Sequence, residues 1–178
     1  MRVKLNKSMN SELQINYKKM NTVYLLLGSN MGNSEQQLLD AIENITQQIG
    51  KITDQSSLYT TAAWGESNQP DFLNQVIIVE SEIMAFPMLE ITLSIEKKMG
   101  RVRTTKNAPR VIDIDILFFN KEIIATTNLT IPHPEIENRR FVLIPLNELS
   151  PNLLHPISNL PISILLKNCK DTLDVKKF

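Results

Sequence analysis

Two aspartates that lie two residues apart are the feature of this chain best suited to chemistry. Within one apolar, strand-like segment, Asp113 and Asp115 alternate with Ile112, Ile114 and Ile116. Successive side chains of a strand point to opposite faces, so both carboxylates share one face, roughly 7 Å apart. At an effective dielectric constant of about 20, their repulsion is on the order of 2 kcal/mol. A solvated strand face tolerates such a pair, and so does a site that binds a divalent cation between the two carboxylates.

A basic segment precedes this acidic pair. Between Glu96 and Asp113 the chain has no acidic residue and six basic ones, namely Lys97, Lys98, Arg101, Arg103, Lys106 and Arg110. The first two lysines suit the last turn of a helix, where cations are favoured. Arginines bind phosphate oxygens with two parallel hydrogen bonds, and Mg²⁺ prefers carboxylate, phosphate and water oxygens. A basic loop that leads into an acidic pair therefore predicts a site for a metal–polyphosphate complex.

Composition excludes several classes of protein. The chain has 178 residues, 42% of them apolar, which is enough for one domain with its own core. Lys plus Arg and Asp plus Glu number 19 each, so we expect no nucleic-acid partner and no attraction to an anionic membrane. The single cysteine, Cys169, excludes an internal disulfide framework and fits a reducing cytoplasm. No apolar run approaches the roughly 18 residues that span a bilayer.

The first 21 residues differ from the rest of the chain. They carry five basic residues and one acidic residue, without the apolar run that a secretory signal requires. We expect residues 1–21 to form a disordered extension and residues 22–178 to form a single domain.

Hydrophobic periodicity and turn residues predict an α+β fold. The expected elements are, in order, a strand over 22–27, a helix over 34–49, a strand over 51–61, a strand over 76–79, a helix over 87–99 and a strand over 111–119. The order β-α-β-β-α-β is that of a ferredoxin-like unit, an antiparallel sheet with two helices packed on one face. The opposite face is then open to ligand, and the two aspartates would point there.

The chain after residue 119 is expected to add to this core. Asn120 and Lys121 suggest a hairpin, the prolines at 132 and 134 exclude a helix around them, and a short helix is expected over 140–149.

Other residues suggest binding less specifically. Gly28-Ser29-Asn30 followed by Gly32 resembles a phosphate-binding turn but lacks the Lys-Ser/Thr of a P-loop, so a tight turn between strand and helix is the favoured interpretation. A planar heteroaromatic ligand is held by ring stacking and amide hydrogen bonds. The candidates for such a slot, each of which could equally be a core residue, are Trp64, Phe72, Asn74 and Phe141.

Three further polar residues have a structural and a functional interpretation. His133, between two prolines, is either an exposed side chain or a phosphate donor. Arg139 is either solvated or reaches the phosphates. Glu96 is best interpreted as a surface carboxylate paired with a nearby Lys or Arg.

Five motifs that occur in order resemble one enzyme family. They are Gly28-Ser29-Asn30, Gln69-Pro70-Asp71-Phe72-Leu73-Asn74, Gly100-Arg101-Val102-Arg103, Pro109-Arg110-x-x-Asp113-x-Asp115-Ile116 and Pro132-His133-x-x-x-x-Arg139-x-Phe141. Together they are similar to 6-hydroxymethyl-7,8-dihydropterin pyrophosphokinase of the folate pathway, from about residue 22 to about residue 160. The sequence departs from the family at Asn107-Ala108, where many members have Trp-Gly.

The resemblance implies a role for each matched residue. It implies that Asp113 and Asp115 bind two Mg²⁺ ions and that these aspartates, with Arg101 and Arg110, are catalytic. The implied pterin-binding residues are Thr61, Ala62, Trp64, Phe72, Asn74 and Phe141. The implied ATP-binding residues are Leu89, Glu96, Arg101, Arg103, Arg110, Ile116, Thr130, His133 and Arg139.

The implied reaction is transfer of diphosphate from ATP to the 6-hydroxymethyl oxygen of the dihydropterin, with release of AMP. We expect a monomeric transferase whose partners are these two substrates. Two alternatives remain open from the residues themselves. A two-metal phosphodiesterase could use the same aspartates without an aromatic–Asn slot, and a non-catalytic ferredoxin-like binding module would leave the acidic pair without a role.

Overall fold

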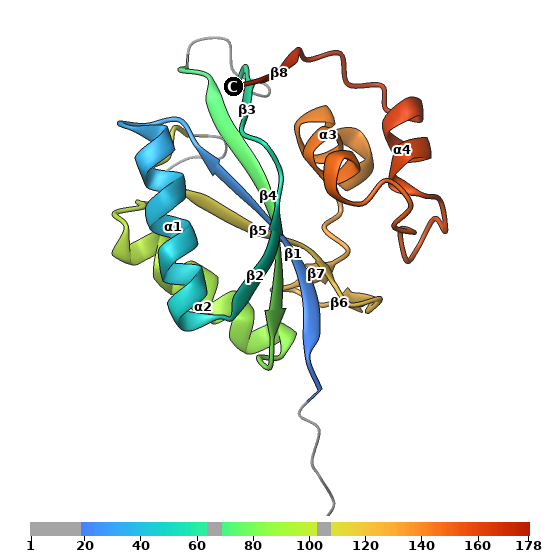
Figure 1. The fold of residues 1–178 in the computed structure, drawn as a ribbon, viewed down its shortest axis with the longest axis horizontal. Helices are drawn as coiled ribbons and strands as arrows, with labels where there is room; N and C mark the ends of the chain where they lie inside the picture. The colour runs from blue at the N-terminus through green and yellow to red at the C-terminus, as the bar shows by residue number, and fades with distance from the viewer. Residues whose placement is uncertain (1–18, 64–68, 103–107) are drawn as a thin grey trace, which may run out of the picture.

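One antiparallel sheet organises the structure, a computed structural model that describes residues 19–63, 69–102 and 108–178 (Figure 1). Within these residues the sheet has the strand order β5-β1-β4-β3-β8, and β2 also pairs with β4. Its strands are β1 (Asn21–Ser29), β2 (Lys51–Gln55), β3 (Tyr59–Thr61), β4 (Phe72–Ser81), β5 (Asp113–Phe119) and β8 (Val175–Lys177). The central order, with β1 and β4 inside and β5 at one edge, confirms the predicted ferredoxin-like α+β fold.

Helices cover both faces of the sheet. Figure 1 shows α1 (Ser34–Gln48) and α2 (Ala85–Lys98) on one face, and α3 (Arg140–Leu149) and α4 (Ile162–Asn168) on the other. A 3₁₀ turn, η1 (Ile136–Asn138), precedes α3, and the short strands β6 (Ile124–Ala125) and β7 (Thr130–Ile131) pair with each other.

Strand β1 is buried on both sides. Val23, Leu25 and Leu27 belong to the core beneath α1 and α2. Tyr24 and Leu26 belong to a second core beneath α3 and α4. A strand covered on both faces needs a continuous apolar run, which is why 22–27 was recognisable from the sequence.

Strand β5 contains a bulge that reverses its alternation of faces. Tyr24 pairs with Phe118 but Leu25 pairs with Ile116, so Leu117 is an extra residue on β5. Ile116 consequently lies in the core beneath α2, whereas Phe118 lies in the core beneath α3. The apolar run over 111–119 gives no indication of this bulge.

Several predicted boundaries differ from the observed ones. The strand predicted over 51–61 is two strands, β2 and β3, because Ser56 leaves the ladder and its Oγ accepts the amide of Val76. Strand β4 extends well beyond 76–79. The predicted helix over 34–49 is α1, and its N-cap is Asn33, whose Oδ1 accepts the Gln36 amide at 3.2 Å.

The helix α2 begins before Pro87, which was predicted to occupy its first position. Its first residue is Ala85 and its N-cap is Met84. Strand β1 begins at Asn21, which the sequence analysis assigned to the N-terminal extension, and the Asn21 side chain donates to the carbonyl of Ile83.

In the C-terminal third, one predicted element is confirmed, one prediction is wrong, and two observed elements were not predicted. The helix predicted over 140–149 is α3. The hairpin predicted through Asn120 and Lys121 is wrong, because β6 pairs with β7 and not with β5. Helix α4 and strand β8 were not predicted, and β8 pairs with β3 at the sheet edge (Figure 1).

A close approach at Gly50 gives a first prediction. A Cβ at this position would lie 2.1 Å from the backbone carbonyl oxygen of Glu80, so α1 and β4 would have to move apart. We expect Gly50→Ala to lower the free energy of unfolding by about 1–3 kcal/mol. Gln48→Ala, an exposed change on the same helix, is the control. Equal denaturation midpoints for the two variants would contradict the prediction.

Candidate active site

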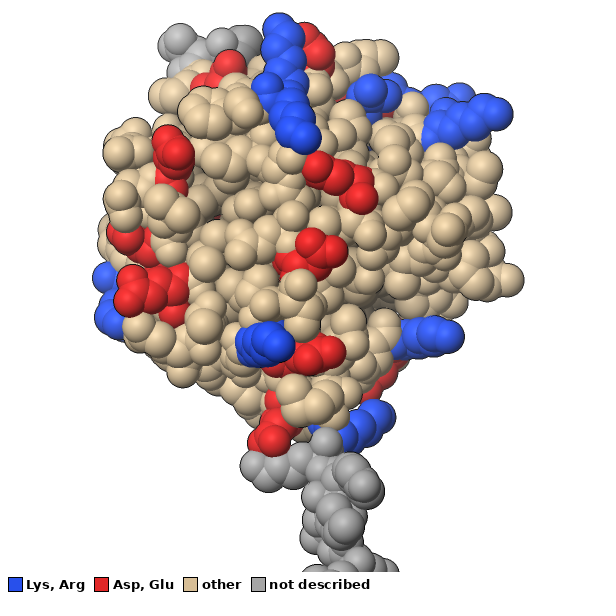
Figure 2. All heavy atoms as spheres, in the orientation of Figure 1, with Lys and Arg blue, Asp and Glu red and all other residues tan. Residues whose placement is uncertain are grey.

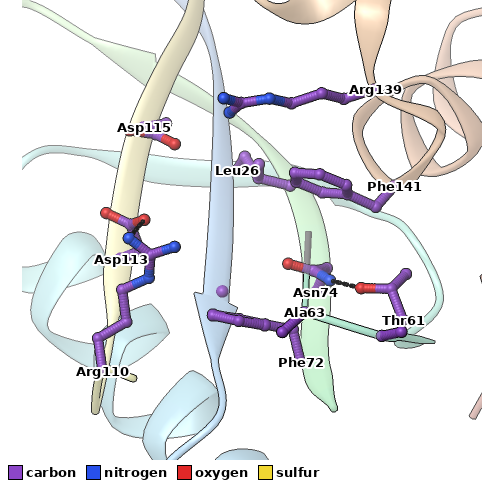
Figure 3. Close-up of a pocket in the computed structure, with 12 residues that line it drawn as sticks. Leu26, Thr61, Ala63, Phe72, Asn74, Arg110, Asp113, Asp115, Arg139 and Phe141 are labelled. Carbon is purple, nitrogen blue, oxygen red and sulfur yellow. Dashed lines mark hydrogen bonds and ion pairs between the residues drawn. The ribbon is translucent and has the colours of Figure 1, made fainter. Parts of the chain in front are cut away.

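A cleft of about 600 Å³ opens on the sheet face opposite α1 and α2 (Figure 3). Both aspartates of β5 line it, as the alternation of the strand predicted. The other lining residues are Leu26, Gly28, Thr61, Ala62, Ala63, Phe72, Asn74, Arg110, Arg139 and Phe141. The cleft therefore joins an acidic and basic side to an aromatic and amide side (Figure 3).

The Asp113 carboxylate is paired with two guanidinium groups. Arg101 Nη1 bonds to its Oδ1, and Arg110 Nη1 lies 3.1 Å from its Oδ2. Burial opposes the charge on Arg101, but Asp113 and then Glu96 outweigh it and raise the pKa of the guanidinium. Arg101 is therefore held as a cation beside the acidic pair.

Glu96 is buried, with 3% exposure, and is not the surface carboxylate that the sequence suggested. Its predicted pairing is confirmed, because its Oε1 contacts Arg101 Nη1 at 2.5 Å. The same oxygen accepts the Ile114 amide at 2.9 Å. Since β5 is an edge strand, this amide would otherwise lack a partner on the sheet. Glu96 thus fixes the strand and one arginine together.

Asp115 is the most perturbed acid of the site. Burial, followed by the neighbouring charges of Asp113 and Glu96, raises the pKa of its carboxyl from 3.8 to about 7. Arg110 and Arg139 act in the opposite direction but do not compensate. A carboxyl group whose pKa is raised this far by burial and by neighbouring negative charges is typical of a functional position.

The carboxylates of the cleft fit an Mg²⁺ ion whose remaining ligands come from a bound substrate and water. No group of three or more His, Cys, Asp or Glu side chains in the described ranges could enclose a metal ion. Two carboxylates facing one cleft match the usual protein contribution to Mg²⁺, which takes its other ligands from phosphates and water. Asp113 and Asp115 are the residues that would hold it.

The aromatic side of the cleft is a slot for a flat ring. Phe72 comes from β4 and Phe141 from α3, and Asn74 lies between them (Figure 3). An arginine covers each ring, with the guanidinium carbon of Arg110 5.1 Å from the Phe72 centroid and that of Arg139 5.8 Å from the Phe141 centroid.

The Asn74 amide is fixed from two directions. Its Nδ2 donates to Thr61 Oγ1 at 2.9 Å, which tethers it to the end of β3. On the other side lies Gly28, where a Cβ would stand 3.0 Å from Asn74 Oδ1. The glycine that resembled part of a phosphate-binding turn therefore leaves space for an amide in the slot.

A second cleft adjoins the first at Asp115, which lines both. It lies between α2, β5 and the segment around β7. It brings together five of the residues predicted to bind ATP, namely Leu89, Glu96, Ile116, Thr130 and His133. Glu90, Leu93, Asn128 and Pro134 also line it and were not predicted.

His133 is prepared to donate a hydrogen bond. Burial and then the charge of Arg139 lower the pKa of its imidazole, so the ring is neutral at pH 7. Its Nδ1 accepts the Glu135 amide at 3.2 Å, which leaves the proton on Nε2. The backbone amide of His133 donates to Leu117 on β5 at 3.0 Å and fixes the segment beside the strand.

Comparisons with known proteins identify the family. The sequence model of the 7,8-dihydro-6-hydroxymethylpterin-pyrophosphokinase (HPPK) family matches residues 24–151. The chain belongs to the HPPK family. It is 42% identical over 145 residues to the 2-amino-4-hydroxy-6-hydroxymethyldihydropteridine pyrophosphokinase of Aquifex aeolicus, covering 80% of this chain and 89% of that protein. The Haemophilus influenzae enzyme of the same name is 37% identical, over 85% of this chain and 95% of its own length.

Solved structures show the same HPPK fold. The wild-type Plasmodium falciparum HPPK-DHPS crystallised with pteroate aligns with a TM-score of 0.68 and 18% identity, over 84% of this chain. The present chain spans only 44% of that longer protein. Among the described residues, no helix has the length and apolar character needed to cross a membrane.

Some predicted HPPK residues could not be compared with the structure. Trp64, Arg103 and the departure from the family at Asn107 lie outside the described residues. Every other predicted site residue lines one of the two clefts, except Arg101, which reaches the acidic pair through Asp113.

Asn30 is a site residue that sequence reasoning did not assign a role. Its Nδ2 donates to Gln69 Oε1 and to the Pro70 carbonyl, while its Oδ1 accepts the Arg110 amide at 2.8 Å. The buried amide thus connects the segment before Phe72 to the segment that carries Arg110. Its presence in the Gly-Ser-Asn motif was the available signal.

The raised pKa of Asp115 predicts a stability effect with a defined sign. Well below pH 3.8 the carboxyl is protonated in both folded and unfolded chains and contributes no difference. As the pH rises from 3.8 to about 7, the unfolded chain releases this proton while the folded chain retains it, so wild-type stability falls; above about pH 7 both chains carry the charge and the loss is complete. In EDTA, we expect Asp115→Asn to be more stable than wild type by more than about 1 kcal/mol at pH 8 and by much less at pH 4.5.

Thermal melting at the two pH values measures this difference. Asp54→Asn, which changes an exposed aspartate on β2, is the matched control and should follow the wild type at both. A pH-independent effect of the Asp115 change would refute the assigned cause.

Proposed function

We propose that this chain catalyses the reaction after which its relatives are named, with residues 22–178 as the catalytic domain. Diphosphate is transferred from ATP to the hydroxymethyl oxygen of 6-hydroxymethyl-7,8-dihydropterin, giving AMP and the pterin diphosphate of folate biosynthesis. One observation carries the proposal beyond family membership, namely that Asp115 belongs to both clefts. The acidic pair thus stands where a ligand in the aromatic slot would meet the phosphates of a ligand in the second cleft.

The pterin occupies the aromatic slot in this proposal. Its ring stacks between Phe72 and Phe141, and the fixed Asn74 amide offers both a donor and an acceptor to the pterin edge. Thr61 at the end of β3 and Ala62 directly after it complete this side.

ATP occupies the second cleft. Leu89, Ile116 and Thr130 face the adenosine, and His133 Nε2 donates to a phosphate oxygen. Glu96 borders this cleft while it fixes Arg101. The triphosphate is neutralised by Arg101, Arg110 and Arg139, whose charges act on the acidic pair, and by Arg103.

Asp113 and Asp115 hold Mg²⁺, and we propose two ions, because two carboxylates and a triphosphate provide enough oxygen ligands for both. When bound, Mg²⁺ would supply charge neutralisation and would lower the pKa of a coordinated hydroxyl. The phosphates of bound ATP would compete with the Asp113 carboxylate for the guanidinium groups of Arg101 and Arg110.

The residues contribute mainly position and charge. The pterin hydroxymethyl oxygen forms a bond to the β-phosphorus, the bond from this phosphorus to the α-phosphate oxygen breaks, and the hydroxyl proton leaves. Phosphoryl transfer of this kind requires alignment and stabilisation of charge more than covalent help. The arginines stabilise the charge that develops on the AMP leaving group.

We propose a monomeric enzyme, in which both clefts are lined by described residues of the same chain. The free thiol of Cys169 and the need for ATP support a cytoplasmic location. The aromatic–amide slot favours the kinase over the two alternatives, because a phosphodiesterase does not need it and a simple binding module does not need the acidic pair.

The direct test is an assay for AMP. With Mg-ATP, purified protein should release AMP only when 6-hydroxymethyl-7,8-dihydropterin is added, and EDTA should abolish the release. AMP release at the same rate with and without the pterin would instead support a phosphodiesterase. Pterin binding with no release of AMP would support a binding module.

Removing one carboxylate should reduce the rate strongly. We expect Asp115→Asn to lower kcat by at least about a hundredfold, because one metal ligand and one negative charge are lost at the reacting phosphates. The affinity for the pterin should change much less. Glu43→Gln, an exposed carboxylate on α1, should leave kcat unchanged. Near-normal turnover of the Asp115 variant would end the assignment.

Removing the slot amide should have the opposite signature. We expect Asn74→Ala to raise the KM for the pterin at least about tenfold, since two hydrogen bonds to the ligand edge are lost, with little change in the KM for ATP. Steady-state kinetics with each substrate varied in turn measures this split. Asn44→Ala on α1 is the control. A larger increase in the KM for ATP than in the KM for the pterin would contradict the assignment of Asn74 to the pterin slot.

A further inference from the structure

We propose that the last residues of the chain position the pterin slot without touching the pterin. The C-terminal strap, defined here as residues 171–177, connects the N-terminus of α3 to strand β3, and Asp171 is its principal positioning residue. The proposal rests on the proposed function, because it assigns the strap to the pterin side of that reaction. Residues 171–177 are absent from the lining of both clefts in the described chain, and they lie beyond the 24–151 match to the family.

The first attachment of the strap is at the start of α3. Arg139, the N-cap residue, gives no side-chain hydrogen bond to the helix. The Arg140 amide instead donates to Asp171 Oδ2 at 2.9 Å, across 31 residues of sequence. Amides of the first helical turn have no partner within the helix, and a carboxylate there is also favoured by the helix dipole. Asp171 therefore supplies the cap that Arg139 does not.

The orientation of this carboxylate is fixed. Its other oxygen, Oδ1, accepts the Leu173 amide at 3.0 Å. Both oxygens are used, one by the helix and one by the strap itself. This contact fixes the turn of α3 that carries Arg139 and Phe141, the two residues that α3 and its N-cap contribute to the first cleft.

The second attachment lies only four residues further along the chain. Val175 begins β8 and pairs with Thr61 on β3, and the Phe178 amide donates to Leu58 at 2.9 Å. Thr61 is the residue that holds the Asn74 amide. Four residues of extended chain span at most about 14 Å, so the strap limits how far the α3 side of the slot can move from the β3 side.

The rest of α3 is held independently of Asp171. Glu148, near the end of the helix, accepts hydrogen bonds from the Ser57 amide and hydroxyl and from the Tyr59 hydroxyl. Loss of Asp171 would therefore release the first turn of α3 and leave the remainder docked on β3. The ring of Phe141 would lose its fixed position opposite Phe72.

The effect should be larger for one substrate than for the other. The strap contacts the elements that carry Phe141 and Thr61, whereas the second cleft is built from α2, β5 and the segment around β7. A lost hydrogen bond of this kind corresponds to roughly a two- to tenfold change in an equilibrium constant. We expect this loss in pterin affinity and a clearly smaller loss in Mg-ATP affinity, because the released turn also carries Arg139, which the proposed function places at the phosphates.

Calorimetry on the full-length chain tests the proposal. The probes are 6-hydroxymethylpterin, titrated in the presence of a non-hydrolysable Mg-ATP analogue, and the analogue alone. Asp171→Ala should weaken pterin binding about two- to tenfold and raise the Kd of the analogue by a clearly smaller factor. Asp171→Asn, which keeps one acceptor oxygen, should lie between Asp171→Ala and wild type. The control is Asp174→Ala, which removes an exposed charge from the same strap.

Each other outcome has a defined meaning. If Asp171→Ala leaves the affinity for the pterin unchanged, or weakens binding of the pterin and of the Mg-ATP analogue by the same factor, the proposed role of the strap is wrong. If Asp171→Ala does not unfold cooperatively, Asp171→Asn decides by the same two criteria. If wild-type protein does not bind the pterin at all, the proposed function fails first, and the two failures are thereby distinguished.

Discussion

Electrostatic repulsion between Asp113 and Asp115 is the constraint around which the site is organised. The zigzag of β5 puts both carboxylates on one face, and burial makes their charges costly to maintain. Arg101 and Arg110 offset part of this cost at Asp113, and Glu96 orients Arg101. The site thus pairs carboxylates with guanidinium groups. In the proposed complex, Mg²⁺ would pair with the carboxylates and the triphosphate would pair with the guanidinium groups.

The sheet explains why two different substrates can meet at this pair. Strand β5 is at the edge, so its carboxylates can border one cleft shared with β1, β4 and α3 and another shared with α2 and the β7 segment. Strand β4 supplies Phe72 and Asn74 directly beside β1. A small antiparallel sheet therefore places flat-ring recognition and phosphate recognition on either side of Asp115.

Local patterns in the sequence were sufficient for the core of the fold and for the acidic pair, whereas the roles of most other candidate site residues came from the family resemblance. The apolar runs of β1 and β5 and the helical stripe of α1 gave the element order, and the period of two along β5 gave the common face of the aspartates. Contacts between distant segments were not accessible in this way. Nothing near Glu96 indicates that it becomes buried against the Ile114 amide, and nothing near Asp171 indicates that it caps α3. Strand β8 was missed because a three-residue edge strand leaves too short a pattern.

The extra residue at Leu117 limits which changes of sequence β5 can tolerate during evolution. The first half of β5 places Asp113 and Asp115 on the face that lines the cleft, and its second half places Phe118 in the core beneath α3. The single inserted residue keeps both sets of side chains on this face. Exchange of one side chain for another at Leu117 alters packing only, whereas loss of the position would turn one half of β5 over relative to the other. Natural variation should therefore tolerate substitutions here far more readily than insertions or deletions.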